Sequence, residues 1–177
     1  MRCIYTTNHS LFLEYVISLH REGQTVWFCS GKRWATAKRY LASAGVMPIL
    51  IREITREDEV KPFACTHEAE LVGIKFADEF STEGERRDWI LPHLEIHRSA
   101  YAFGDPELSK CDIDERVADE LEGFIDAETF YGIRSLKRIK PILLTNLVKD
   151  SDGEHVSGDY DRSYAICRYP VSIDKAQ

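Results

Sequence analysis

The sequence predicts an α+β fold in which strands outnumber helices. Three observations predict it: strand-like runs recur between glycine and polar turns, two helical patterns occur early, and a helical block interrupts the strands late. Helices and strands do not alternate regularly, which disfavours a doubly wound parallel sheet. We therefore expect one domain over residues 1–177, a mixed β pseudo-barrel with two early helices, and an acidic helical insert over residues 82–128.

The chain is expected to open with a strand, a helix and a second strand. Residues 2–6 form a short strand-like run, and the segment after it repeats apolar residues at helical spacing. Asn8 or Ser10 can cap this helix, and Gly23 ends it. Residues 25–29 are β-branched and aromatic, which is typical of a buried strand.

A second helix and two further strands are expected before the insert. Thr36 is the best N-cap for the helix, and Gly45 ends it. Residues 47–54 then form a strand. Residues 63–76 alternate enough to form another strand with one polar face, bent at Gly73 because glycine weakens regular pairing.

The sequence of the insert predicts two helices. Pro92 suits the first turn of a helix that runs to about Tyr101, and Asp112 or Asp114 can cap a second helix that ends at Gly123.

The pattern of the closing part of the sequence predicts three strands. Residues 129–139 and 141–147 are strand-like, Asp152-Gly153 forms a turn, and residues 162–169 alternate as a final strand.

Charge is distributed unevenly along the chain, whose formal net charge is −7. The insert holds fourteen acids and five bases, a balance of −9, which leaves the remaining residues at +2. Residues 31–56 hold six bases and one acid, and residues 129–149 hold five bases and no acid. If these two basic stretches meet in space, they can contact a phosphate backbone. The alternative is that they are separate solvated faces.

The cysteines and the apolar segments indicate a cytoplasmic protein without a membrane partner. The number of cysteines is odd, and no C-x-x-C pair occurs, so free thiols in a reducing compartment are expected. The apolar segment 11–19 is interrupted by Glu14 and is too short to span a membrane. The cysteines are Cys3, Cys29, Cys65, Cys111 and Cys167.

Several chemical motifs are incomplete. Ser30-Gly31-Lys32 follows a strand but lacks the remaining residues of a nucleotide-phosphate loop. His93 and His97 have the spacing of two zinc ligands on a helix, but the sequence offers no clear third ligand. The sequence therefore predicts neither a metal nor a cofactor.

One short cluster combines a thiol, an imidazole and a carboxylate. In Cys65-Thr66-His67-Glu68, strand alternation places Cys65 and His67 on one face and Glu68 on the other. A Cys/His pair is then geometrically possible, and these three residues are weak catalytic candidates. The alternative is that His67 is a partly buried structural histidine.

Three segments carry a family resemblance. Trp34-Ala35-Thr36 resembles the W-[ST]-T element that follows the first helix in YTH and EVE domains. Residues 67–74 (H-E-A-E-L-V-G-I) resemble the central strand of these domains, and residues 138–142 with 162–166 resemble their closing strands. The chain thus resembles the PUA-like superfamily, which includes EVE, YTH and ASCH domains. The resemblance implies a concave pocket that reads a modified base in DNA or RNA.

The role of Trp34 depends on where the second helix begins. If the helix begins just before Trp34, the indole shares a face with Leu41 and belongs to the core. If Thr36 is the cap, Trp34 lies in the preceding loop and its ring can line a pocket. The sequence does not indicate a second tryptophan for such a base-binding pocket, because Trp27 lies in an apolar strand and Trp89 lies in the insert.

The main hypothesis is a nucleic-acid-binding module in which basic side chains contact phosphates and two aromatic rings stack on a base. It predicts binding that weakens steeply with salt. One alternative is a small hydrolase or nuclease on an ASCH-like scaffold, and another is an acidic adaptor that binds a protein partner through the insert. The residues assigned to nucleic-acid binding are Lys32, Arg33, Trp34, Thr36, Lys38, Arg39, Tyr131, Lys137 and Arg138.

Overall fold

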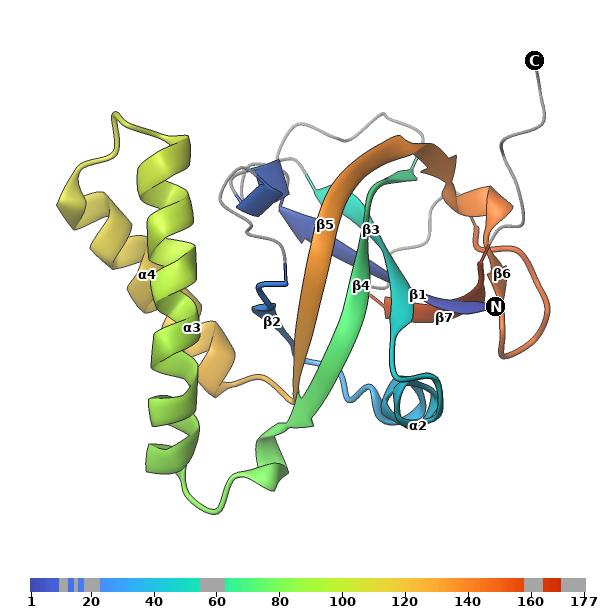
Figure 1. Ribbon diagram of the computed structural model, residues 1–177, viewed down its shortest axis with the longest axis horizontal. Coiled ribbons are helices and arrows are strands. Elements are labelled where there is room, and N and C mark those ends of the chain that lie inside the picture. Colours follow the sequence, from blue (N-terminus) through green and yellow to red (C-terminus); the bar gives the residue numbers. More distant parts are fainter. Residues whose placement is uncertain (10–12, 15, 18–22, 55–62, 158–163, 170–177) are drawn as a thin grey trace.

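The chain combines one mixed sheet with helices, which confirms the α+β prediction (Figure 1). This computed structural model describes residues 1–9, 13–14, 16–17, 23–54, 63–157 and 164–169. The strands are β1 (Arg2–His9), β2 (Val26–Ser30), β3 (Met47–Ile54), β4 (Ala64–Phe76), β5 (Thr129–Leu143), β6 (Val148–Lys149) and β7 (Tyr164–Arg168). The helices are α2 (Ala35–Ala44), α3 (Glu83–Gly104) and α4 (Lys110–Ile125), with the 3-10 turns η1 (Ala77–Glu79) and η2 (Leu144–Asn146).

The sheet has the strand order β2-β5-β4-β3-β1-β7-β6. β1 and β3 are parallel neighbours, and the other neighbouring pairs are antiparallel. Among the described strands, the edge strands β2 and β6 do not pair with each other, so the expected pseudo-barrel is an open sheet. A barrel needs hydrogen bonds between its two edges, and β6 is only two residues long.

Both faces of the central strands are buried. Ile49 and Ile51 of β3 pack in one core, together with Leu41 of α2. Leu50, which lies between them, packs on the opposite face with Cys167 of β7. This alternation is the two-residue period of a β-strand, and it assigns each buried residue of the sheet to one face or the other.

The early strands follow the sequence pattern closely. β3 has the predicted bounds, and β2 lies within one residue of them. β1 extends to His9, so Asn8 lies in a strand and does not cap a helix. The alternative cap, Ser10, lies outside the described residues, as does most of the expected first helix. Leu13, Glu14, Val16 and Ile17 are described and are helical.

α2 begins at Ala35, so the prediction of Thr36 as its cap is wrong by two residues. The N-cap is Trp34, whose side chain makes no capping bond. Tertiary contacts fix this start instead, because the Trp34 N–H donates to the Thr129 hydroxyl at 3.1 Å and that hydroxyl donates to the carbonyl of Lys32 at 2.8 Å. Gly45 ends the helix with φ 75°, as predicted.

The insert forms two helices, but both begin earlier than the sequence predicts. The Thr82 hydroxyl accepts from the N–H of Glu85, which starts α3 nine residues before Pro92 at Glu83 and leaves Pro92 inside the helix. α4 begins with a capping box in which Ser109 caps the helix, so Asp112 is its third residue instead of its cap.

A separate apolar core joins the insert to the sheet. Ile90 of α3 and Phe124 of α4 pack against Phe130 of β5. In Figure 1 the two helices lie side by side next to β2 and β5. Within the described part of the chain, none of the helices is long and apolar enough to cross a membrane.

The closing strands differ from the prediction in two respects, of which one is that residues 144–146 of the predicted strand 141–147 form the 3-10 turn η2. β5 runs without a break from Thr129 to Leu143, because pairing with β4 continues past Pro141 through irregular register. Gly153 lies in the predicted turn with φ 76°. β7 confirms the final strand over residues 164–168, and residues 162–163 of that prediction lie outside the described residues.

Candidate functional site

Trp34 lies in the core, so the interpretation that its ring lines an open pocket is wrong. Its side chain is fully buried. The rings of Tyr131 and Tyr164 stack on it, each at 4.5 Å between centroids and with interplanar angles of 19° and 14°. A base cannot stack on this indole unless one of the tyrosines leaves.

Tyr131 is also unavailable as a stacking surface. It is 2% exposed, and its ring lies between Trp34 and Phe28, whose centroid is 5.6 Å away. Burial raises the pKa of its hydroxyl, which hydrogen-bonds Thr6 and Asn8. Tyr131 therefore holds the interior of the sheet together, and the predicted cage with Trp34 does not open to solvent.

Two cations of the first basic stretch are paired with neighbouring acids. Arg33 pairs with Asp78 at 2.9 Å, and Lys38 pairs with Glu79. Both cations also lie over the ring of Phe76, at 4.2 and 4.5 Å from its centroid. These contacts satisfy both side chains within the protein and leave little positive charge for a phosphate.

Two other members of the assigned set remain available. Lys32 and Arg39 are exposed, and no described acid pairs with either of them. Arg39 donates to the Thr36 hydroxyl at 3.2 Å, which occupies the side chain of Thr36 within α2.

The assigned residues of the second basic stretch lie far from residues 32–39 of the first, and they are paired as well. Lys137 contacts Glu68 at 3.2 Å, and Arg138 contacts Glu14 at 2.5 Å. Thr129 marks the position of the first stretch on β5, and Lys137 lies eight residues further along that strand. Eight residues of a strand span roughly 26 Å, so Lys137 and Arg138 do not share a surface with the assigned residues 32–39.

The predicted Cys65/His67 pair does not form. The pairing of β4 with β3 shifts register between these residues, from Ile51 opposite His67 to Arg52 opposite Cys65. Cys65 therefore packs on the face of Cys167, away from the imidazole. A β-bulge reverses the simple alternation on which the prediction relied.

Cys65 is expected to be unreactive in the native state. Burial raises the pKa of its thiol, and the neighbouring Cys167 raises it further. Cys111 is exposed, so a thiol reagent at pH 8 should modify it rapidly and modify Cys65 only after urea unfolds the chain. Mass spectrometry of the labelled peptides checks this, and rapid native labelling of Cys65 would contradict it.

Glu68 lies on the other face from His67, as predicted, but it serves a structural contact. It accepts from the hydroxyl of Tyr169 at 2.6 Å in addition to pairing with Lys137. Cys65 and Glu68 both lie on the opposite side of the sheet from His67, and the structure does not combine the three candidates into an acid/base site.

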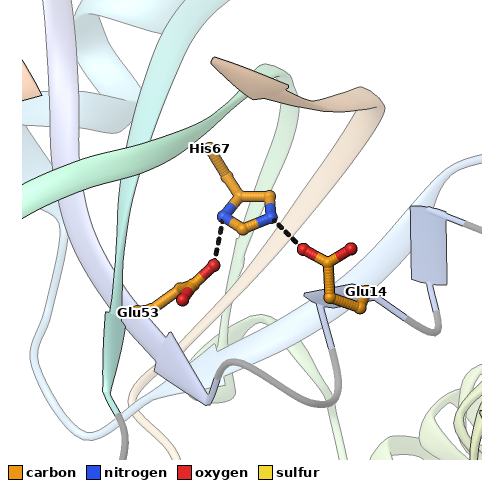
Figure 2. A group of neighbouring side chains, drawn as sticks. All are labelled: Glu14, Glu53 and His67. Atoms are coloured by element: carbon orange, nitrogen blue, oxygen red, sulfur yellow. Dashed lines mark hydrogen bonds and ion pairs between the residues drawn. The ribbon is translucent and has the colours of Figure 1, made fainter. Parts of the chain in front are cut away.

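Two glutamates that the sequence analysis missed contact His67 (Figure 2). Nε2 lies 3.0 Å from Glu14 Oε1, and Nδ1 lies 3.2 Å from Glu53 Oε1 and 3.0 Å from the Thr66 hydroxyl. A carboxylate only accepts hydrogen bonds, so a ring nitrogen of His67 bonds to the glutamate beside it only when that nitrogen carries a hydrogen. His67 is fully buried, which places it out of reach of a substrate.

The same three residues could in principle offer ligand atoms to a metal ion, since these atoms lie within 4.8 Å of one another. The two carboxylates, however, contact different nitrogens of one ring, so an ion held by all three would break one of these bonds. Burial raises the pKa of Glu14, but hydrogen bonds from Arg138 and His67 outweigh it and lower the value overall. The cluster is best described as an ion-paired clamp between β3, β4 and the residues after β1.

A different aromatic cluster forms where the insert meets the sheet. Trp27 of β2 and Trp89 of α3 meet edge to face, with centroids 5.0 Å apart and an interplanar angle of 77°. His93 lies one helical turn after Trp89, 4.6 Å from its ring and 5.7 Å from that of Trp27. All three side chains are partly exposed. We call these three residues the Trp27–Trp89 cluster.

Two paired glycines form the floor beneath Trp27. Gly73 of β4 lies opposite Gly132 of β5. A Cβ atom at Gly73 would lie 2.8 Å from Cη2 of the indole, and one at Gly132 would lie 3.0 Å from its Cε2. The indole can therefore lie flat across two strands only because both positions lack a side chain.

Lys75 adds a positive charge beside the cluster. Its ammonium lies 3.9 Å from the ring centroid of Phe80 and 5.3 Å from that of Trp89. It follows Gly73 by two residues on β4, so the strand places the charge and the glycine floor together.

His97 anchors the insert to the strand that carries Trp27. Its Nε2 donates to the carbonyl of Trp27 at 2.9 Å, and its Nδ1 lies 2.6 Å from Glu120 of α4. Glu120 also accepts from the hydroxyl of Tyr101. This buried network links α3, α4 and β2, and it fixes the position of Trp89 relative to Trp27.

Local signals for this cluster exist in the sequence. Trp89, His93 and His97 are spaced by four residues, which places them on one helix face. Glycines inside strands mark a close approach of another group, and both Gly73 and Gly132 interrupt strand patterns. No local pattern, however, indicates that this face of α3 packs against Trp27.

Comparisons with known proteins found little. No family model matches the chain, and no curated protein matches its sequence. Among solved structures, the chain is similar to the N-terminal domain of McrB from Staphylothermus marinus, with 15% sequence identity and a TM-score of 0.41. The match covers 80% of this chain and 76% of that one. A TM-score this low does not establish a shared fold, so the likeness carries no inference about this chain.

Proposed function

We propose that the chain is a PUA-like nucleic-acid-binding module that stacks a base on the Trp27–Trp89 cluster. The observation that carries this proposal is the meeting of two partly exposed indoles, Trp27 and Trp89, which are 62 residues apart in sequence, with Trp27 lying on a glycine floor. The family resemblance supplies the expectation of a base-reading aromatic pocket. The proposal moves that pocket from Trp34 to this cluster.

The charge beside the cluster favours a nucleotide over a cationic ligand. Aromatic cages also bind quaternary ammonium groups, but the ammonium of Lys75 already lies over Phe80 and Trp89. A second cation there would be repelled, whereas the phosphate next to a stacked base would be attracted. Each stacked base contributes about 1–3 kcal/mol to binding in comparable sites.

The bound base cannot be stacked between its neighbours in a continuous duplex. The two indoles meet nearly at right angles, so a base that contacts both must have its faces free. Single-stranded DNA or RNA meets this condition, and so does a nucleotide flipped from a duplex. An added methyl group would give a modified base more apolar surface to bury against the indoles.

Stacking is expected to contribute more to affinity than phosphate contacts. The insert carries a balance of −9, and four of the assigned bases are held in ion pairs. With Lys75 as the cation identified beside the cluster, log Kd should change with log salt by a slope of about 1. The steep salt dependence expected from the sequence is therefore replaced by a shallow one.

The test is a binding titration in which Trp89→Ala is compared with wild type. Fluorescence anisotropy with labelled single-stranded DNA and RNA, each with and without methylated bases, measures the affinity. Trp89→Ala should weaken binding about 5- to 100-fold, because it removes one stacking surface. Leu91→Ala is the matched control. Leu91 lies on the same helix, is 41% exposed, and is not among the residues of the apolar core between the insert and the sheet.

Both variants must retain the far-ultraviolet circular dichroism spectrum of the wild type for this comparison to be interpreted. If wild type binds none of these oligonucleotides, or if Trp89→Ala binds as tightly as wild type, the proposal fails.

We also propose that the protein works in a reducing compartment. All five cysteines are free, and Cys3, Cys65 and Cys167 are buried side by side in one core without forming a disulfide.

A further inference from the structure

His93 is partly exposed, and it differs from the buried His67 and His97 in having no partner among the described residues for its ring nitrogens. His67 and His97 each have a hydrogen-bond partner for both nitrogens. No described residue donates to or accepts from the nitrogens of His93, although its ring contacts both tryptophans of the cluster. Because its ring is partly exposed beside two indoles, His93 can offer a nitrogen to a ligand that stacks there.

The surroundings of His93 keep its ring neutral near pH 7. Burial lowers the pKa of His93, and the electrostatic interaction with His97 on the same helix lowers it further. The other charged groups packed around this position are Lys75 on β4 and Glu120 on α4, and Glu120 is paired with His97. A neutral imidazole keeps one nitrogen as a hydrogen-bond acceptor, whereas a protonated ring only donates.

We propose that His93 reads the edge of the base bound at the Trp27–Trp89 cluster by accepting a hydrogen bond from an exocyclic amino group. This inference rests on the proposed function and extends it to a substrate class. Adenine and cytosine carry an exocyclic amino group at the ring position where thymine and uracil carry a carbonyl oxygen. The cluster supplies affinity through stacking, and His93 supplies the preference for an amino-bearing base.

The experiment isolates one base at a time. Each probe is a labelled seven-nucleotide single strand whose central residue is adenine, cytosine or thymine and whose other residues are abasic. Wild type should bind the adenine and cytosine probes roughly 3- to 10-fold more tightly than the thymine probe, which is the effect of one hydrogen bond. His93→Phe keeps an aromatic ring but has no nitrogen, so it should bind all three probes with similar affinity.

Two further measurements separate base reading from a structural role. His93→Gln offers an amide oxygen as an acceptor and should retain the preference. Lowering the pH until His93 becomes protonated should abolish the preference in wild type while leaving His93→Phe unchanged. A structural role would instead change affinity for all probes in proportion.

The outcomes distinguish the two proposals. If Trp89→Ala binds every probe as tightly as wild type, the stacking site itself is wrong. If Trp89→Ala weakens all probes but His93→Phe keeps the preference of wild type, or if wild type shows no preference, then only the role of His93 is wrong.

Discussion

Replacing Trp34 by alanine should lower the free energy of unfolding by about 3–5 kcal/mol, the loss typical of a buried aromatic residue. The indole is fully buried and is sandwiched between Tyr131 and Tyr164. Its removal leaves a cavity that two rings cannot fill, because the backbone at this position is fixed by the bond from Trp34 N–H to Thr129. Urea denaturation followed by circular dichroism measures the change.

Trp34→Phe provides the matched control for this variant. The indole nitrogen is buried and has no hydrogen-bond partner in the described part of the chain. Phenylalanine keeps most of the stack and removes this unsatisfied donor, whose burial costs about 1–3 kcal/mol. We therefore expect a much smaller loss for Trp34→Phe than for Trp34→Ala. A loss below about 1 kcal/mol for Trp34→Ala would indicate a pocket residue instead of a core residue.

Replacing Gly73 by alanine should displace the indole of Trp27 and weaken nucleic-acid binding to the level of Trp89→Ala. The new Cβ would lie 2.8 Å from Cη2 of Trp27, a distance that real structures do not tolerate. The indole is held on its other side by Trp89 and His93, so it can move away only by disrupting the cluster. Overpacking of this kind typically costs about 1–3 kcal/mol of stability.

Gly123→Ala is the control for the effect of an added methyl group. Gly123 lies in α4, and a Cβ there would meet nothing within 4 Å. Alanine should stabilise the helix by about 0.5–1 kcal/mol and leave binding unchanged. Anisotropy titrations and urea denaturation of both variants test the comparison. Unchanged affinity and stability in Gly73→Ala would show that Trp27 does not depend on the glycine floor.

The parts of the fold that were predicted correctly depend on local pattern. Residues 47–54 are apolar and β-branched between turn residues, and β3 has these bounds. The insert was recognised because acids and helical spacing replace the strand pattern there, although Pro92 misled the placement of its first helix. Capping by Thr82 and Ser109 decided the true helix starts, and both residues follow the ordinary preference for hydroxyl caps.

The candidate site was mostly not predictable, because it depends on contacts between distant segments. Strand alternation placed Cys65 beside His67, but a bulge that only pairing with β3 reveals separates them. Local charge suggested two phosphate-binding stretches, but Asp78, Glu79 and Glu68 neutralise much of them from elsewhere in the chain. The acidic adaptor hypothesis for the insert stays a prediction.

The sequence by itself determined the α+β class, most strand positions, the helical insert and its acidity, because hydrophobic period and turn residues act within a few positions. Only the tertiary structure decided that Trp34 is in the core and that Trp27 and Trp89 meet at the surface. The physical reason is that the environment of an indole is set by what packs against it. The rings of Tyr131 and Tyr164 pack against Trp34. The groups that pack against Trp27 are a glycine pair and α3, a helix that begins 56 residues later in the chain.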